Sequence, residues 1–192
     1  MYDSAGSHHS YHAYLTKRSR VSVFVRRLFI RDLARHFHGQ VLDVGCGIGE
    51  FLNCHKASFG VDANPLLVSE CLQRGYKSCV AVAGSLPFAS RSFDGVLISN
   101  VLEHLDDPKI ALREATRVSR TEGILVITVP QEAGFRHDPT HVQMLRRSDI
   151  EELARGCGLT IRSIYHFPFF IKWLGHYLYF CELRAVLVRG VA

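Results

Sequence analysis

Three glycines at alternate positions follow a short apolar run, and this pattern constrains the fold more than any other feature of the chain. The segment reads Val41-Leu-Asp-Val-Gly45-Cys-Gly47-Ile-Gly49-Glu-Phe51. Glycines let a backbone turn tightly and pass close to a ligand that a β-carbon would push away. We therefore expect a strand, a ligand-binding turn at its carboxyl end and then a helix, as in open α/β sheets.

Apolar runs alternate with helical patterns from residue 41 onward. Strands are expected at 41–44, 59–62, 78–82, 95–99, 123–129, 159–165 and 183–188, and helices from Phe51, at 66–74, at 108–119 and at 148–155 with Ser148 as the N-cap. This order is typical of an α/β fold, here a single Rossmann-like domain with a seven-stranded, mostly parallel sheet and helices on both faces. A length of 192 residues fits one such domain.

The glycine spacing indicates which ligand the turn binds. A dinucleotide fingerprint needs G-x-G-x-x-G, but Glu50 stands where its third glycine would fall. A carboxylate there would repel a pyrophosphate, which disfavours a nicotinamide-dependent oxidoreductase. S-adenosylmethionine (SAM) has no phosphate and carries a cationic sulfonium and an amino group, so Asp43 and Glu50 are compatible with it.

An acid follows the second expected strand, in Gly60-Val-Asp62-Ala63-Asn64. In nucleotide-binding α/β folds, an acid at this place accepts hydrogen bonds from ribose hydroxyls. A turn or helix cap is the alternative, which the following Asn64-Pro65 also favours. Together with the glycine turn, the ribose role is the better interpretation of Asp62.

Residues 41–130 resemble the class I SAM-dependent methyltransferase superfamily, in particular its small-molecule and lipid group, methyltransferase type 11. Four blocks carry the resemblance: VLDVGCGIGEF, GVDANP, LPFASRSFDGVLISNVLEHLDDP and REATRVSRTEGILVITVP. The chain departs from the family pattern at Val82 and Ala83, where relatives place adenine contacts, and at Arg120–Gly123, which replaces a Pro-Gly-Gly turn.

The resemblance implies SAM as the cofactor and assigns its binding residues by region. The methionine part would contact the glycine turn, the ribose would contact the acid after the second strand, the adenine would lie against the segment after the third, and the end of the fourth strand would face the methionine. The residues implied are Asp43, Gly45, Cys46, Gly47, Gly49, Asp62, Ala63, Ser85, Leu86 and Asn100.

Two histidine positions are candidates for catalysis. Methyl transfer needs a general base only where the acceptor is a poorly ionised hydroxyl or an acidic carbon. His104 follows the fourth strand and His141 lies in the loop after the fifth, so both should project from the ligand-binding edge. Packing beneath the pocket is the alternative for His104, and a loop-fixing hydrogen bond to Asp138 is the alternative for His141. Because the spacing of His137, Asp138 and His141 is not diagnostic, we expect no metal.

Two segments outside the cofactor motifs stand out. Basic residues gather between Lys17 and Arg35, which indicates either attraction to an anionic acceptor or the solvated face of a helix at 21–37. The buried stripe of that helix would be Val21, Phe24, Val25, Leu28, Phe29 and Leu33. Residues 165–180 are rich in aromatic side chains and suggest core packing, a homodimer contact or a lid over a substrate or membrane surface.

We divide the chain into an N-terminal segment, 1–20, that is flexible or acts as a lid, and a methyltransferase domain, 21–192, with an aromatic-rich insertion at 165–182. The six cysteines lack a CxxC pair and there is no secretory signal, so a cytoplasmic location with reduced thiols is expected. The aromatic segment is too interrupted for a transmembrane helix, although peripheral membrane contact fits it.

The predicted function is methyl transfer from SAM to a small-molecule, lipid or sugar-type acceptor. One alternative is a non-catalytic SAM-binding or partner-binding domain, and another is an RNA-directed methyltransferase that uses the basic segment. A nucleic-acid partner is not expected, because no RNP-like motif is present and Ser99-Asn100-Val101-Leu102 replaces the Asn/Asp-Pro-Pro-Tyr/Phe motif of amino-methylating enzymes.

Overall fold

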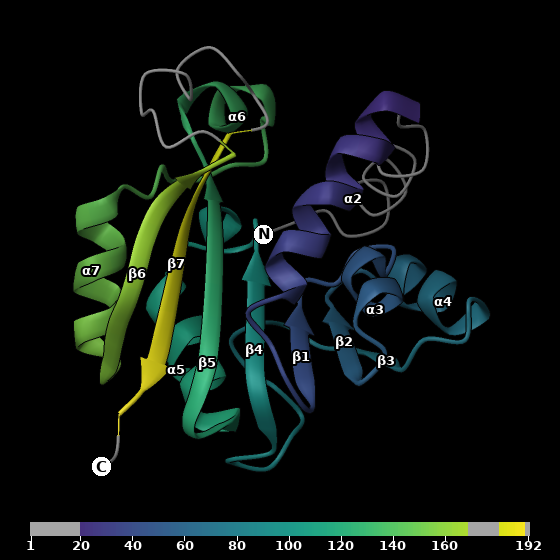
Figure 1. Cartoon of the computed structure of the whole chain (residues 1–192), viewed down its shortest axis with the longest axis horizontal. Coiled ribbons are helices and arrows are strands. Elements are labelled where there is room, and N and C mark those ends of the chain that lie inside the picture. Colours follow the sequence, from purple (N-terminus) through teal and green to yellow (C-terminus); the bar gives the residue numbers. More distant parts are fainter. Residues whose placement is uncertain (1–19, 169–180, 191–192) are drawn as a thin grey trace.

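The computed structural model describes residues 20–168 and 181–190, and these form a seven-stranded sheet with the order β3-β2-β1-β4-β5-β7-β6 (Figure 1). The strands are β1 (Val41–Val44), β2 (Ser58–Asp62), β3 (Ser78–Val80), β4 (Phe93–Ser99), β5 (Ser119–Pro130), β6 (Leu159–Phe167) and β7 (Glu182–Arg189). The first five run parallel, and β7 is antiparallel to both of its neighbours, β5 and β6. The predicted α/β fold with a mostly parallel sheet is confirmed.

Helices connect these strands and cover the sheet. They are α2 (Arg20–Ala34), α3 (Glu50–Cys54), α4 (Pro65–Gln73), the 3-10 helix η1 (Leu102–His104), α5 (Pro108–Val118), α6 (Glu132–His137) and α7 (Arg147–Gly156). Pro65 and Pro108 each occupy the first helical turn, behind the side-chain caps Asn64 and Asp107. The short helices η1 and α6 were not predicted, because three to six residues carry too little periodicity.

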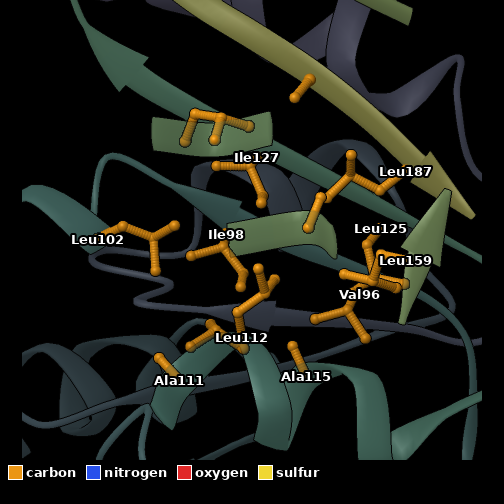
Figure 2. Close-up of a cluster of buried hydrophobic side chains, with 14 of the residues drawn as sticks. Val96, Ile98, Leu102, Ala111, Leu112, Ala115, Leu125, Ile127, Leu159 and Leu187 are labelled. Atoms are coloured by element: carbon orange, nitrogen blue, oxygen red, sulfur yellow. The ribbon is translucent and has the colours of Figure 1, made fainter. Parts of the chain in front are cut away.

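Two apolar layers lie on opposite faces of the sheet, because side chains alternate along each buried strand. On one face, Val96 and Ile98 of β4 pack with α5 and α7; Figure 2 shows this layer around Leu112, with Ala111 and Ala115 of the same helix. On the other face, Leu97 of the same strand packs with Leu33 of α2 and Phe51 of α3. The sheet is thus buried on both faces, as expected of parallel strands.

The carboxyl ends of the parallel strands meet at one edge of the sheet. In Figure 1 the arrowheads of β1, β2, β4 and β5 point toward this edge, and α6 lies beyond the end of β5. The glycine turn after β1, Asp62 at the end of β2 and Asn100 after β4 are therefore brought to the same side of the molecule.

One local prediction is wrong in part and another is wrong. In the predicted stripe of α2, Phe29 and Leu33 are buried, but Phe24 and Leu28 are exposed at 63% and 48%. Ile30 and Phe37, which lie outside that stripe, are buried. The buried face is therefore rotated relative to the predicted stripe, because it follows the partner surface of the sheet. Ser148 is not the N-cap of α7. That helix starts at Arg147, and the Asp149 carboxylate accepts a hydrogen bond from the Arg146 amide.

A buried arginine fixes α2 against β7. Arg184 is fully buried, and its guanidinium donates to the carboxylates of Asp32 and Glu182 at 2.6 Å each. The same group lies 3.6 Å over the ring of Phe167, at the end of β6. Since a buried cation needs paired anions, this arrangement determines how the first described helix sits on the last strand.

No helix within residues 20–168 and 181–190 is long and apolar enough to cross a membrane. Residues 1–19 and 169–180 lie outside the described residues, and with them most of the predicted N-terminal segment and aromatic-rich insertion.

Candidate functional site

The glycine turn has the backbone conformation that its sequence predicts. Gly45, Gly47 and Gly49 have φ angles of 75°, 53° and 79°, in the left-handed region that side chains disfavour. A Cβ on Gly45 would clash with Cγ2 of Val101, and a Cβ on Gly49 would lie 2.6 Å from the ring of Tyr76. The turn is therefore closed in by neighbours that leave no room for a larger residue.

Asp62 connects this turn to the second strand. Its Oδ2 accepts a hydrogen bond from the Gly47 amide at 2.9 Å, and its Oδ1 accepts one from the Asn64 amide at 2.9 Å. The bond to Asn64 is the turn contact that was the alternative to a ribose role, whereas the N-cap of α4 is Asn64 itself. The ribose role of Asp62 stays a prediction. Ala63, the next residue, is exposed.

Asp43 lies beneath the turn and is 3% exposed. Burial raises its pKa to about 7, and the neighbouring Asp62 and Glu50 act in the same direction, while Arg26 opposes them. Arg26 donates from Nε to Glu50 at 3.3 Å, so α2 brings one cation to this group of acids. Three carboxyl groups with one arginine suit a positively charged ligand.

Cys46 is buried in a small cluster with Leu52 and Cys71. A Cβ on Gly60 would lie 2.7 Å from its sulfur, so the thiol packs against the second strand. Its backbone amide donates to the Val61 carbonyl at 3.0 Å. Cys46 therefore contributes to the turn through packing.

The segment predicted to border adenine is tied to α5. The Leu86 amide donates to the Glu114 carboxylate at 2.8 Å, and its carbonyl accepts from Arg117 at 3.0 Å. The Leu86 side chain is buried in the core, whereas Ser85 is exposed and pairs with Val82 in an isolated bridge. Of these two residues, only Ser85 presents its side chain to the surface.

Asn100 ends β4 with a φ angle of 54°, an unusual conformation for a residue other than glycine. Its amide donates to the Thr128 carbonyl at 2.9 Å, which holds the chain against β5 as it turns toward Val101. Val101 in turn lies against Gly45, so the segment that leads into η1 begins beside the glycine turn.

The two predicted histidines come together beyond that segment. The ring centroids of His104 and His141 lie 4.7 Å apart, and the ring of His141 also stacks on Phe135. Burial and the neighbouring His141 lower the pKa of His104, which favours its neutral form. The structure therefore unites residues that are 37 positions apart in the sequence.

Hydrogen bonds determine the proton position on each ring. His141 Nδ1 lies 2.8 Å from the Phe135 carbonyl, which only accepts, so Nδ1 carries the hydrogen. Thr140 Oγ1 donates to Asp138 at 2.6 Å, and so it accepts from His104 Nδ1 at 3.1 Å. A ring with its one hydrogen on Nδ1 keeps a lone pair on Nε2. The alternative of a loop-fixing hydrogen bond between His141 and Asp138 is met in the main chain, where the His141 amide donates to the Asp138 carbonyl at 3.3 Å, while the imidazole bonds to Phe135.

Glu103 is a third member of this cluster and was not predicted. It is fully buried, and its Oε1 lies 3.9 Å from His141 Nε2. Burial raises the pKa of Glu103 to about 8. The backbone amide of Glu103 lowers this pKa, but its effect is smaller than that of burial. The available signal in the sequence was an acid directly before His104, inside an apolar segment that follows a buried strand.

Comparisons with known proteins agree with this geometry. Residues 42–127 match a family profile described as "Methyltransferase domain". The uncharacterized protein MJ1123 of Methanocaldococcus jannaschii is 34% identical over 107 residues, which cover 55% of this chain and 52% of that protein. The O-methyltransferase resE of Aspergillus sclerotiorum is 37% identical over 144 residues, covering 63% and 54%. The chain thus spans about half the length of these curated relatives.

A solved structure extends the similarity of fold beyond the matched residues. A SAM-dependent methyltransferase from Thermotoga maritima aligns with a TM-score of 0.67 and 17% identity, over 88% of this chain and 96% of that one. At this identity, the likeness concerns the fold.

Proposed function

The chain contains a SAM-dependent methyltransferase domain of the type 11 family, and from this premise we propose that it transfers the methyl group of SAM to an oxygen atom of a small-molecule, lipid or sugar-type acceptor. The observation that carries the proposal is the pair of histidines, His104 and His141, whose ring centroids lie 4.7 Å apart. His104 lies three residues after Val101, which packs against Gly45 of the glycine turn.

The residues at the glycine turn fit SAM. Asp43, Glu50 and Asp62 supply negative charge for a cationic ligand, and the positive φ angles of the glycines let the backbone approach it. Asp62 would accept hydrogen bonds from the ribose hydroxyls, and the Gly47 amide holds its carboxylate beside the glycine turn. Ser85 would border the adenine, and Asn100 would face the methionine end.

SAM supplies an electrophilic methyl carbon on a sulfonium. The protein must align the acceptor oxygen with that carbon, exclude water and accept the proton that the hydroxyl loses. His141 is suited to the last task, because the bond from its Nδ1 to Phe135 orients the ring and leaves Nε2 as the proton acceptor. His104, held by Thr140, would orient the acceptor.

A chemical argument and the similarity to one relative support an oxygen acceptor. A hydroxyl is poorly ionised at neutral pH and benefits from a base, whereas an unprotonated amine does not. The relative resE, which is 37% identical, is named as an O-methyltransferase.

Methyl transfer from radiolabelled SAM to separate panels of hydroxylated small molecules, sugars, lipid vesicles and RNA tests this proposal. We expect label on a hydroxyl-bearing acceptor of the first three panels, and a loss of at least about tenfold in kcat for His141→Gln. His137→Gln, at the exposed end of α6 four residues before His141, is the matched control and should retain activity. Label on RNA alone, or SAM binding with no transfer to any panel, would instead support the RNA-directed or the non-catalytic alternative.

A further inference from the structure

A buried carboxyl group lies in the histidine cluster with neither oxygen satisfied. Glu103 is fully buried, and within the part of the chain that the structure describes no other residue donates a hydrogen bond to Oε1 or Oε2. An isolated buried carboxylate is costly, so such a group is normally paired with a cation or a hydrogen-bond donor. The main chain around Glu103 is well satisfied, since its carbonyl accepts from the amides of Val142 at 2.8 Å and Gln143 at 3.2 Å.

Two histidines lie beside Glu103. With the Nδ1 atoms of His104 and His141 engaged by Thr140 and Phe135, the nitrogen that each ring can offer to a metal is Nε2. One ligand atom from each of Glu103, His104 and His141 can be chosen so that all three lie within 4.8 Å of one another. Three side chains that can each give one ligand atom to a metal thus converge, and within the described residues the buried carboxyl group among them has no cation close enough to pair with it, an arrangement that a bound cation would complete.

We infer that Glu103, His104 and His141 form a binding site for a divalent transition metal such as Zn²⁺. Zinc binds imidazole nitrogen and carboxylate oxygen at about 2.0–2.2 Å, which places tetrahedral ligands roughly 3.4 Å apart. The 3.9 Å between His141 Nε2 and Glu103 Oε1 needs a small contraction to reach that separation. Two imidazoles with one carboxylate suit zinc, iron, cobalt or manganese, whereas magnesium and calcium prefer oxygen ligands.

The surroundings of both histidines are those of metal ligands. A ligating histidine usually donates its other ring hydrogen to a carbonyl or a carboxylate-linked group, which fixes the ring and raises its basicity. His141 donates to the Phe135 carbonyl, and His104 donates to Thr140, which is itself bonded to the Asp138 carboxylate. These partners come from the loop after β5, so that loop completes the site.

This inference rests on the proposed transfer to an oxygen atom and revises one step of it. A bound metal would hold the acceptor oxygen and promote its ionisation, so His141 would be a metal ligand in place of the general base, and His104 would be a second ligand. A site with three protein ligands retains an open position for such an oxygen. The metal site itself can be tested without SAM or an acceptor, so its failure is distinguishable from failure of methyl transfer.

Titration of the metal-free full chain with Co²⁺, followed by visible absorption and by the bound metal content, tests the site. Because closely spaced histidines compete for such ions, His8, His9 and His12 are replaced by alanine in every protein compared. We expect one cobalt ion per chain. The cobalt affinity should be weaker by at least about tenfold in Glu103→Gln and in His141→Ala. The matched control His137→Ala should bind cobalt with unchanged affinity. Zn²⁺ should displace the cobalt.

Cobalt binding that is unchanged in Glu103→Gln and in His141→Ala would overturn the inference. The absence of any cobalt signal up to roughly 100 µM Co²⁺ would also overturn it, because structured metal sites have dissociation constants well below that concentration. Circular dichroism of the metal-free variants shows whether each is folded. Should one of them fail to fold, His104→Gln replaces it, with the same expected loss.

Discussion

Asp62 and Gly47 are joined by a hydrogen bond from the Gly47 amide to the Asp62 carboxylate, 2.9 Å from nitrogen to oxygen. This bond links the end of β2 to the glycine turn that follows β1, two adjacent strands of the sheet. The position of an acid suited to a ribose is thereby coupled to the backbone that would cradle the methionine part of SAM. A substitution at Asp62 or at Gly47 should therefore weaken SAM binding, because it disturbs the acid and the glycine turn together.

Replacing Gly45 by alanine should reduce stability more than the same change at Gly75. The two glycines have similar φ angles, 75° and 78°, but a Cβ on Gly45 would clash with Val101, whereas one on Gly75 meets nothing within 4 Å. Backbone strain alone costs about 1–2 kcal/mol, and overpacking adds about 1–3 kcal/mol. Urea denaturation of the two variants measures the difference in the free energy of unfolding. Equal decreases in the two variants would mean that the Val101 side chain moves aside without destabilising the protein.

SAM affinity should fall as pH decreases below about 7. Burial, with Asp62 and Glu50 nearby, raises the pKa of Asp43 to about 7 against the opposing effect of Arg26. A cationic ligand favours the ionised carboxyl group, so protons compete with SAM, and each binding event releases protons below that pH. Calorimetry at pH 5.5 and 8 tests this with Asp43→Asn, which should lose the dependence. A wild-type affinity equal at both values would exclude Asp43 from contact with the cation.

Removing the buried arginine should destabilise the protein strongly. Arg184→Ala leaves the carboxylates of Asp32 and Glu182 without their cation, and breaking a buried ion pair costs about 3–5 kcal/mol. The matched control is Arg147→Ala, whose partner Glu151 is exposed and whose ion pair should contribute less than about 1 kcal/mol. Thermal unfolding of both variants compares the losses. Similar small losses would mean that α2 is held to β7 by apolar packing alone.

The sequence predicted the parts of the structure that depend on residues close together in the chain. The strand at 41–44 matches β1, and Gly45, Gly47 and Gly49 have the positive φ angles that their spacing required. The seven strands all appear near their expected positions, since each apolar run is bounded by turn residues.

What the sequence did not reveal depends on distant contacts. The buried face of α2 was misjudged at Phe24 and Leu28, because several faces of that helix carry apolar residues and the sheet selects one. Glu103 was missed because its burial requires the loop around Val142 to fold over it, as the hydrogen bond from the Val142 amide shows. Arg184 gave no sign of its role, since Asp32 lies 152 positions away.

Calorimetric titration of the purified protein with SAM, with NADH as the competing cofactor, tests the central claim most directly. We predict micromolar binding of SAM, no preference for NADH, and affinity weaker by at least about tenfold in Asp62→Ala, which loses its charge-assisted hydrogen bonds. Glu152→Ala, on the exposed surface of α7, should bind as the unchanged protein does. A protein that binds no SAM, or prefers NADH, would contradict the account.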